Sequence, residues 1–315
     1  MAVAEGVYAT KSARRAHLAD PSAPDHREAV ENIANYLSLV HLLSRSIDKM
    51  LAEGCALSTL QYRILLRLLS AGERHVCASD LAANLHVGLS TVSAAMQKLV
   101  EAGKVDRAGA SDDMRVFELE LTSRGRAAIR EADEQVGKFL EAYWHRLTRE
   151  QLETAIASSL SAAALHDAER VENGRLRLDT AFFDAVMTSR TLTACKLATL
   201  GFKTVEFRIL VDLYLRDEEV ACSQVARHLF LSSGDVTSPI KRLESTELLT
   251  KRCDASNRRM KKVALTQAGR TSTVELLPQV FDALLETCHS DEAAIRIHLE
   301  AARHVIAQER ASVFA

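Results

Sequence analysis

The sequence predicts a mainly α-helical protein with small β-hairpins, built from two similar halves. An internal repeat aligns the string TLQYRILLRL, which starts at Thr59, with TVEFRILVDL, which starts at Thr204; a shift one residue shorter then aligns Leu121 with Leu265. Most other segments have apolar residues at the three- and four-residue spacing of helices. Phe117–Leu121 instead alternates with the two-residue period of a half-buried strand. A repeat this long indicates a duplicated domain rather than a solenoid array.

Each copy begins with a core helix, followed by two short helices. The apolar stripes of the core helices are Leu60, Ile64, Leu65 and Leu68 in the first copy and Val205, Ile209, Leu210 and Leu213 in the second. The short helical patterns are SDLAANL with TVSAAMQKLV and SQVARHL with DVTSPIKRLE. This spacing is that of a helix-turn-helix, whose second helix can enter a DNA major groove. In the second copy, Ser232 followed by Asp235 fits a capping box at the start of that helix.

A β-hairpin is expected after each helix pair. Residues 105–107 and 249–251 are predicted as first strands, and Phe117–Leu121 as a return strand. Polar loops, 109–115 and 254–259, lie between the strands. Each copy therefore contains the elements of a winged helix-turn-helix, with the hairpin as its wing.

Long helical segments are predicted around these elements, over residues 25–53, 124–173, 176–200 and 269–309. Helices with a wide apolar face need a surface that covers them, and the other copy is the obvious candidate. We therefore expect a first domain over 25–173 and a second over 174–315, joined by interleaved helices. A tail over 1–24, with Pro21 and Pro24, is expected to be disordered.

The order of these elements, with the motif Leu-Thr-x-x-Gly leading from the wing into a long helix, resembles the multiple antibiotic resistance regulator (MarR) family of bacterial transcription factors. The most specific stretch runs from Leu229 to Gly269. Members of that family are normally homodimers with one winged unit per subunit on each half of a near-palindromic operator. The resemblance thus implies a single-chain pseudo-dimer that binds double-stranded DNA, as a monomer or in a higher oligomer.

Composition excludes several classes of protein. The chain has 315 residues and a formal net charge of −2, a length that suggests about two domains. No apolar run approaches the ~18 residues of a membrane span or reads as a signal peptide, so we expect a cytoplasmic protein. Six cysteines and eleven histidines follow no metal-ligand or disulfide spacing. No Gly-rich phosphate loop, constrained carboxylate pair or nucleophile arrangement indicates an enzyme, and no cofactor is implied.

Polar residues of the helix-turn-helix and the wing are the candidate DNA contacts, because such side chains reach base edges and phosphates. In the first copy these residues are Ser90, Thr91, Ser93, Gln97, Lys98 and Arg115. In the second they are Ser233, Thr237, Ser238, Lys241, Arg242, Arg258, Arg259, Lys261 and Lys262. The family pattern at the wing is an aspartate followed by an arginine pair. The second copy keeps it, whereas the first retains only Arg115.

Charge is distributed unequally between the two wings. Residues 104–120 carry three basic and five acidic side chains, while 248–264 carry six basic side chains and one acidic. Because basic residues supply most phosphate contacts, we expect the second unit to bind DNA more strongly.

The family resemblance also implies a small, often phenolic or aromatic, effector between the long helices and the winged unit. The candidate residues are His41, Arg45, Tyr62, Met187, Arg190 and Phe207. Two other functions stay open. The acidic first wing suits a protein-interacting co-regulator with reduced DNA binding. The second open function is a redox-responsive regulator. Its most plausible reactive cysteine is Cys253, because the neighbouring cation of Arg252 lowers a thiol pKa.

Overall fold

The computed structural model describes residues 15–72, 76–110, 117–253, 261–287 and 292–314. The chain forms two compact units. The first winged unit comprises Leu43–Thr191, and the second winged unit comprises Met1–Leu42 together with Leu192–Ala315. The packing units therefore follow a different division from the two sequence repeats, because residues 15–42 pack with the second copy.

Two long helices contribute to both units. Helix α2 spans His26–Gly54, with residues 26–42 in the second winged unit and 43–54 in the first. Helix α8 spans Leu178–Thr199; its residues 178–191 belong to the first winged unit and its residues 192–199 to the second. Both helices lie within two residues of the bounds that the apolar periodicity predicts.

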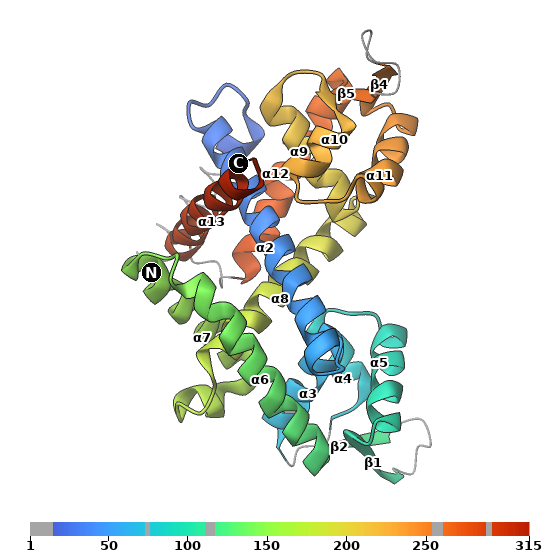
Figure 1. Cartoon of the computed structure of the whole chain (residues 1–315), viewed down its shortest axis with the longest axis vertical. Coiled ribbons are helices and arrows are strands. Elements are labelled where there is room, and N and C mark those ends of the chain that lie inside the picture. Colours follow the sequence, from blue (N-terminus) through green and yellow to red (C-terminus); the bar gives the residue numbers. More distant parts are fainter. Residues whose placement is uncertain (1–14, 73–75, 111–116, 254–260, 288–291, 315) are drawn as a thin grey trace. The chain divides into compact units, whose positions relative to one another are not determined.

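The first winged unit contains the expected winged helix-turn-helix. Its core helix α3 (Thr59–Ala71) precedes α4 (Ala78–Leu85), α5 (Leu89–Glu101), and the antiparallel strands β1 (Val105–Ala110) and β2 (Phe117–Leu121), all labelled in Figure 1. Ser58 caps α3 through a capping box with Gln61. Helices α6 (Ser123–Trp144) and α7 (Arg149–Glu172) follow.

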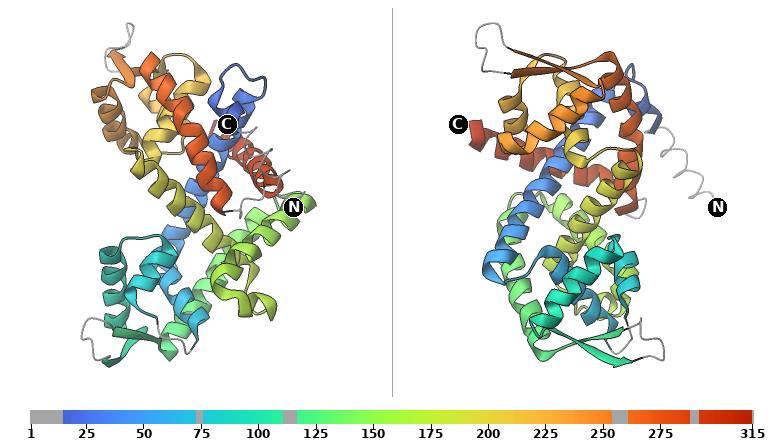
Figure 2. Two further views of the ribbon diagram at one scale, coloured as in Figure 1. Left: turned by 180° about the vertical axis from the view of Figure 1, so that it is seen from behind. Right: turned by 90° about the vertical axis from the view of Figure 1, so that its right-hand side faces the viewer.

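The second winged unit repeats this order with one more strand. Helix α9 (Thr204–Arg216) leads through β3 (Val220–Ala221) to α10 (Cys222–His228) and α11 (Ser233–Ser245). Strands β4 (Leu249–Cys253) and β5 (Lys261–Leu265) form the wing, and the right-hand view of Figure 2 shows them side by side as a pair of strands. The sheet order is β3-β5-β4. Helices α12 (Gln267–Thr287) and α13 (Glu292–Phe314) complete the unit, and the predicted capping box of Ser232 and Asp235 is confirmed at α11.

Three expectations need correction. The segment 124–173 is divided between α6 and α7, because Thr148 and Gln151 form a capping box that starts α7 after the break at residues 145–148. Helix α7 is itself kinked at Asp167, whose backbone is not helical. The segment 269–309 is likewise divided between α12 and α13. The predicted tail is ordered from residue 15 onward, since residues 15–19 are helical and Leu18 is only 2% exposed. Residues 1–14 lie outside the described part of the chain.

The motif Leu-Thr-x-x-Gly explains how each wing joins the next helix. Thr266 donates a hydrogen bond to the carbonyl of Glu247 (2.7 Å) and accepts one from the amide of Gly269 (3.0 Å). A Cβ added to Gly269 would lie 1.9 Å from the carbonyl oxygen of Leu248. Glycine is required here because the backbone of α12 passes directly over the end of the preceding helix-to-strand turn.

We expect Gly269→Ala to lower the free energy of unfolding by about 1–3 kcal/mol, the range for overpacking a tight site. Gly234→Ala is the matched control, since its nearest neighbour would be a side-chain atom at 3.6 Å and alanine favours a helix. Urea unfolding of both variants measures the difference. Equal stabilities for the two would contradict the proposed close contact.

Separating the chain between residues 173 and 174 should unfold both products. The cut removes residues 1–42 from the second winged unit and 174–191 from the first, which exposes apolar faces that favour aggregation. Each fragment is expressed alone and together with the other, and solubility and cooperative unfolding are measured. A fragment that melts cooperatively as a soluble monomer would show that its unit does not need the missing helix.

Candidate nucleic-acid interface

Helices α5 and α11 each bury one face and expose the other. Helix α5 buries Val92, Ala95, Met96 and Leu99, and α11 buries Val236, Ile240 and Leu243. All ten predicted contact residues on these helices are exposed, namely Ser90, Thr91, Ser93, Gln97, Lys98, Ser233, Thr237, Ser238, Lys241 and Arg242. Apolar residues at helical spacing hold the second helix of each pair against its unit and leave a polar face outward. The arrangement suits a helix that reads a groove.

On α5, hydrogen bonds hold the side chain of Gln97 in one orientation. Its carbonyl oxygen accepts from Arg107 on β1 at 2.7 Å, and its amide donates to Glu101 at 2.9 Å. Two fixed partners reduce the rotamer entropy that an exposed glutamine would lose on contacting a base. The bond to Arg107 also links the helix to the wing.

Arg242 on α11 has a structural role alongside any role at DNA. Its guanidinium donates to the carboxylate of Glu206 and to the carbonyl of Gly201 (2.7 Å). Glu206 is only 1% exposed and caps the start of α9 through the amide of Lys203. Lys98 on α5 is the repeat counterpart of Arg242 and is exposed. The counterpart of Glu206 on α3 is Gln61, which carries no charge. The arginine therefore braces α11 against α9 in the second winged unit.

Each wing places two residues of the same charge directly opposite each other. The pair is basic in the second wing and acidic in the first. Arg252 lies directly opposite Lys262 in the β4–β5 hairpin, and Asp106 lies opposite Glu120 in the β1–β2 hairpin. Like charges in such pairs repel each other. Glu219 lies 3.9 Å from Arg252 and offsets part of the repulsion in the second wing. A further anion would be attracted to the second wing and repelled by the first.

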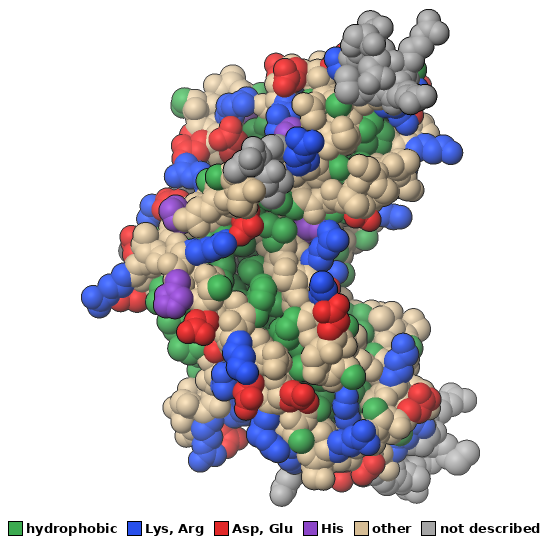
Figure 3. Space-filling model, viewed as in Figure 1, with side chains coloured by type: hydrophobic (Ala, Val, Ile, Leu, Met, Phe, Trp, Pro, Cys, Tyr) green, Lys and Arg blue, Asp and Glu red, His purple; other side chains and the backbone are tan. Residues whose placement is uncertain are grey.

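Some predicted wing residues cannot be placed. Arg115, Arg258 and Arg259 lie outside the described residues. Lys261 is exposed, and its ammonium donates to the sulfur of Cys253 at 2.8 Å, while Lys262 is half-buried. Over the visible face of the molecule, basic and acidic side chains are interspersed (Figure 3).

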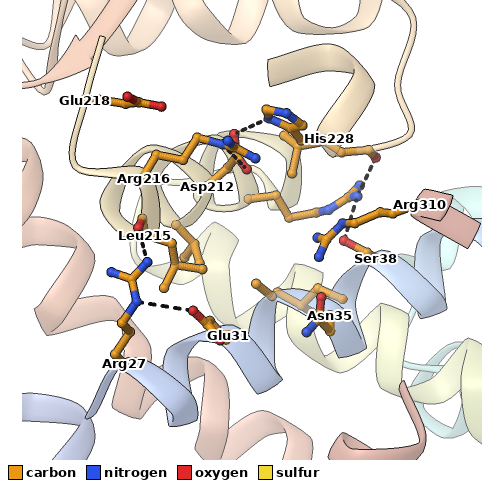
Figure 4. Close-up of a pocket in the computed structure, with 15 residues that line it drawn as sticks. Arg27, Glu31, Asn35, Ser38, Asp212, Leu215, Arg216, Glu218, His228 and Arg310 are labelled. Carbon is orange, nitrogen blue, oxygen red and sulfur yellow. Dashed lines mark hydrogen bonds and ion pairs between the residues drawn. The ribbon is translucent and has the colours of Figure 1, made fainter. Parts of the chain in front are cut away.

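The six candidate effector residues are divided between core and surface. Tyr62, Met187 and Phe207 are buried; the Tyr62 hydroxyl donates to Asp133, and its ring packs 5.1 Å from that of Phe183. Arg190 is exposed and lies 3.2 Å from Asp48. His41 is half-buried and Arg45 is exposed. None of the six lines the pocket around Arg208 (Figure 4) or the pocket around Phe281 in the second winged unit.

Four charged residues lie inside the core helices, although apolar periodicity assigns such residues to the surface. Arg63 and Arg67 on α3, and Arg208 and Asp212 on α9, are buried. Each pair is spaced four residues apart, on the side of the helix next to the apolar stripe. A charge placed beside such a stripe was the signal that would have identified them.

The described residues also bear on the other functions. Burial raises the pKa of the Cys55 and Cys222 thiols, which opposes thiolate chemistry at both. No helix in the described ranges is both long and apolar enough to cross a membrane. Among the same residues, no group of three His, Cys, Asp or Glu side chains is arranged to hold a metal ion.

The fold and its exposed helices define a winged helix-turn-helix protein with two such units in one chain. No family model matches the sequence, and neither does any curated protein. Similar solved structures include a cysteine-to-serine mutant of MarR from E. coli complexed with operator DNA, which is 24% identical, covers 36% of this chain and 81% of its own, and has a TM-score of 0.31. The transcriptional regulator BldR from Sulfolobus solfataricus is 27% identical, covers 38% and 84%, and has a TM-score of 0.32.

We expect Arg242→Ala to lower the free energy of unfolding by about 1–3 kcal/mol, because it leaves the buried carboxylate of Glu206 without its charged partner. Lys98→Ala, at the equivalent position of the first copy, should change stability by less than about 0.5 kcal/mol, as surface substitutions usually do. Thermal melts of the two variants without DNA test this. A similar melting temperature for both would show that Arg242 does not brace the unit.

Proposed function

We propose that the protein is a sequence-specific DNA-binding transcription regulator that acts as a single-chain pseudo-dimer. The observation that carries the proposal is the presence of two winged helix-turn-helix units in one chain, each with a polar second helix exposed. A two-fold pair of such units normally reads a near-palindromic site. One chain supplies both reading helices, so no second copy is required to complete the pair.

The two half-sites would be bound by different means. In the second winged unit, Lys261 and the facing pair Arg252 and Lys262 supply positive charge for phosphate. In the first, Asp106 and Glu120 oppose a close approach of the wing. The first unit would depend more on base contacts from α5, where Gln97 is already oriented.

The salt dependence of DNA binding tests this inequality. Replacing Lys261 and Lys262 together by alanine should lower the slope of log K against log salt by up to about two, if both contact the backbone. The matched change in the first wing, Asp106→Asn with Glu120→Gln, should instead strengthen binding, because it removes two charges that repel phosphate. Operator titrations at several salt concentrations measure both.

Arg259 and its repeat counterpart Arg115 give a second comparison for the same titration. Arg259→Ala should weaken binding by about 1–3 kcal/mol, the range for a charge-assisted contact, and Arg115→Ala by less. Thermal melts confirm that each variant is folded. Equal losses and equal slopes for the two wings would refute the unequal roles.

The stoichiometry tests the pseudo-dimer directly. One chain should saturate one operator whose half-sites are separated by about one helical turn (~10 bp). Light scattering after size exclusion, with and without the operator duplex, gives the number of chains per duplex. Two obligatory chains that each use one winged unit would contradict the proposal, and no binding to any upstream duplex would favour the protein-interacting co-regulator.

A further inference from the structure

The recognition helices, α5 and α11, differ at every position of their first turns, although the positions packed against their units are alike. The segment that starts α5 reads Gly-Leu-Ser-Thr at residues 88–91, whereas that of α11 reads Ser-Ser-Gly-Asp at residues 232–235. All eight of these residues are exposed. The next residue is a buried valine in both helices, Val92 and Val236. Packing therefore holds each helix on its unit in the same way, and the difference is confined to side chains that face outward.

Leu89 gives the first turn of α5 an apolar side chain where α11 has a hydroxyl. It is the first residue of α5 and is 52% exposed, and its counterpart at the start of α11 is Ser233. A single exposed leucine is ordinary on a protein surface, so its place in the fold decides its role. The N-terminal residues of a recognition helix are those that contact base edges in the major groove. Leu89 therefore lies where the helix would meet DNA.

Gly88, the residue before Leu89, leaves the backbone uncovered at the same place. Its φ is −60°, which any residue adopts, and the nearest atom to an added Cβ would be Oγ1 of Thr91 at 3.9 Å. Neither the backbone conformation nor close packing against the described residues requires glycine here. In α11 the same position is Ser232, whose hydroxyl oxygen accepts from the amide of Asp235 and caps the helix. A glycine that the fold does not require suits a close approach of the backbone to a ligand.

An apolar side chain replaces a hydroxyl at a second outward position of α5. Ala94 is exposed, and its counterpart on α11 is Ser238, which is also exposed. Between the two exchanged positions, Ser93 and its counterpart Thr237 keep a hydroxyl in both helices. The outward face of α5 is therefore more apolar than that of α11, and both exchanges act in the same direction.

The chemistry of the major groove gives this difference a meaning. Thymine presents its 5-methyl group there, whereas the other edge groups of the four bases are hydrogen-bond donors and acceptors. A leucine side chain that covers the methyl group removes apolar surface from water. The same side chain over another base would leave a donor or acceptor without its partner. A serine hydroxyl both donates and accepts, so Ser233 can satisfy the polar edge of more than one base.

We propose that Leu89 is a specificity-determining residue, which contacts the 5-methyl group of a thymine in the half-site bound by the first winged unit. The other half-site carries no matching preference, because Ser233 stands at the equivalent position of α11. The operator is therefore asymmetric, and the chain binds it in one orientation, whereas a homodimer on a palindrome has two equivalent orientations. The inference rests on the proposed function and names the residue and the base that distinguish the half-sites.

Selection of bound duplexes from a pool of random sequences tests the asymmetry. The wild-type chain should select thymine at one position of one half-site and should show no preference for thymine at the pseudo-symmetric position of the other. Leu89→Ser should remove this preference, and Ser233→Leu should create one in the other half-site. A symmetric wild-type consensus would overturn the inference and leave the proposed function standing. Enrichment of no duplex at all would overturn both.

Replacing the selected thymine by uracil tests the contact itself, because it deletes the 5-methyl group and leaves base pairing unchanged. The replacement should weaken binding of the wild-type chain by roughly threefold to fivefold, as expected for one buried methyl group. It should leave binding of Leu89→Ser unchanged. Fluorescence anisotropy titrations of the thymine and uracil duplexes measure both.

Leu165→Ser is the matched control for this titration. Leu165 is 75% exposed and lies on α7, outside the recognition helices, so its variant should lose affinity for the uracil duplex as the wild-type chain does. Thermal melts confirm that all variants are folded. An equal loss in the wild-type chain and in folded Leu89→Ser, or no loss in the wild-type chain, would overturn the contact between Leu89 and the methyl group.

Discussion

Each winged unit buries an arginine at the same point of its core helix, and a guanidinium removed from water needs acceptors close by. Arg63 and Arg208 are both 3% exposed. Their acceptors come in part from long helices outside the helix-turn-helix: Asp184 and Thr188 on α8 for the first, and Ser38 on α2 for the second. Sliding of α3 along α8 would leave the buried charge of Arg63 without its carboxylate. Sliding of α9 along α2 would remove the Ser38 hydroxyl from Arg208. The position of each recognition helix depends on this contact, because α5 and α11 pack on α3 and α9.

The copies have diverged most where charge is concerned, while their apolar positions are retained. Arg63 and Arg67 share one carboxylate, whereas the corresponding Arg208 and Asp212 belong to a pocket with other charges. The recognition helices differ in the same way, since Arg242 braces α11 from the side facing α9 and Gln97 is held from the wing. Facing anions in one hairpin and facing cations in the other extend the difference to the wings. Packing preserved the fold in both copies, and surface and buried charges distinguish their roles.

The sequence predicted the elements that show a long periodic pattern or a pair of residues at a defined spacing. The repeat, the stripe of each core helix, the alternation of Phe117–Leu121 and the capping box at Ser232 all correspond to observed structure. The break before α7 was missed although Thr148 and Gln151 carry the signature of a helix start, because the apolar spacing continues across it. Strand β3 has two residues and cannot show a period. The pocket was missed for a different reason: a reading that assigns charged residues to the surface gives no indication that Arg208 lies inside the molecule.

The division of the chain into units affects the order in which it folds during synthesis. The first winged unit, Leu43–Thr191, is continuous and has all its residues once Thr191 has emerged. The second unit needs residues 15–42 together with the segment that follows residue 191, so its earliest part must wait until that later segment has been made. At ~5–20 residues per second, that interval lasts many seconds, during which residues 26–42 of α2 present an apolar face without its partners. Closing a contact over so long a stretch of chain is also entropically slow. The nascent protein is therefore most exposed to chaperones, and to aggregation, at α2.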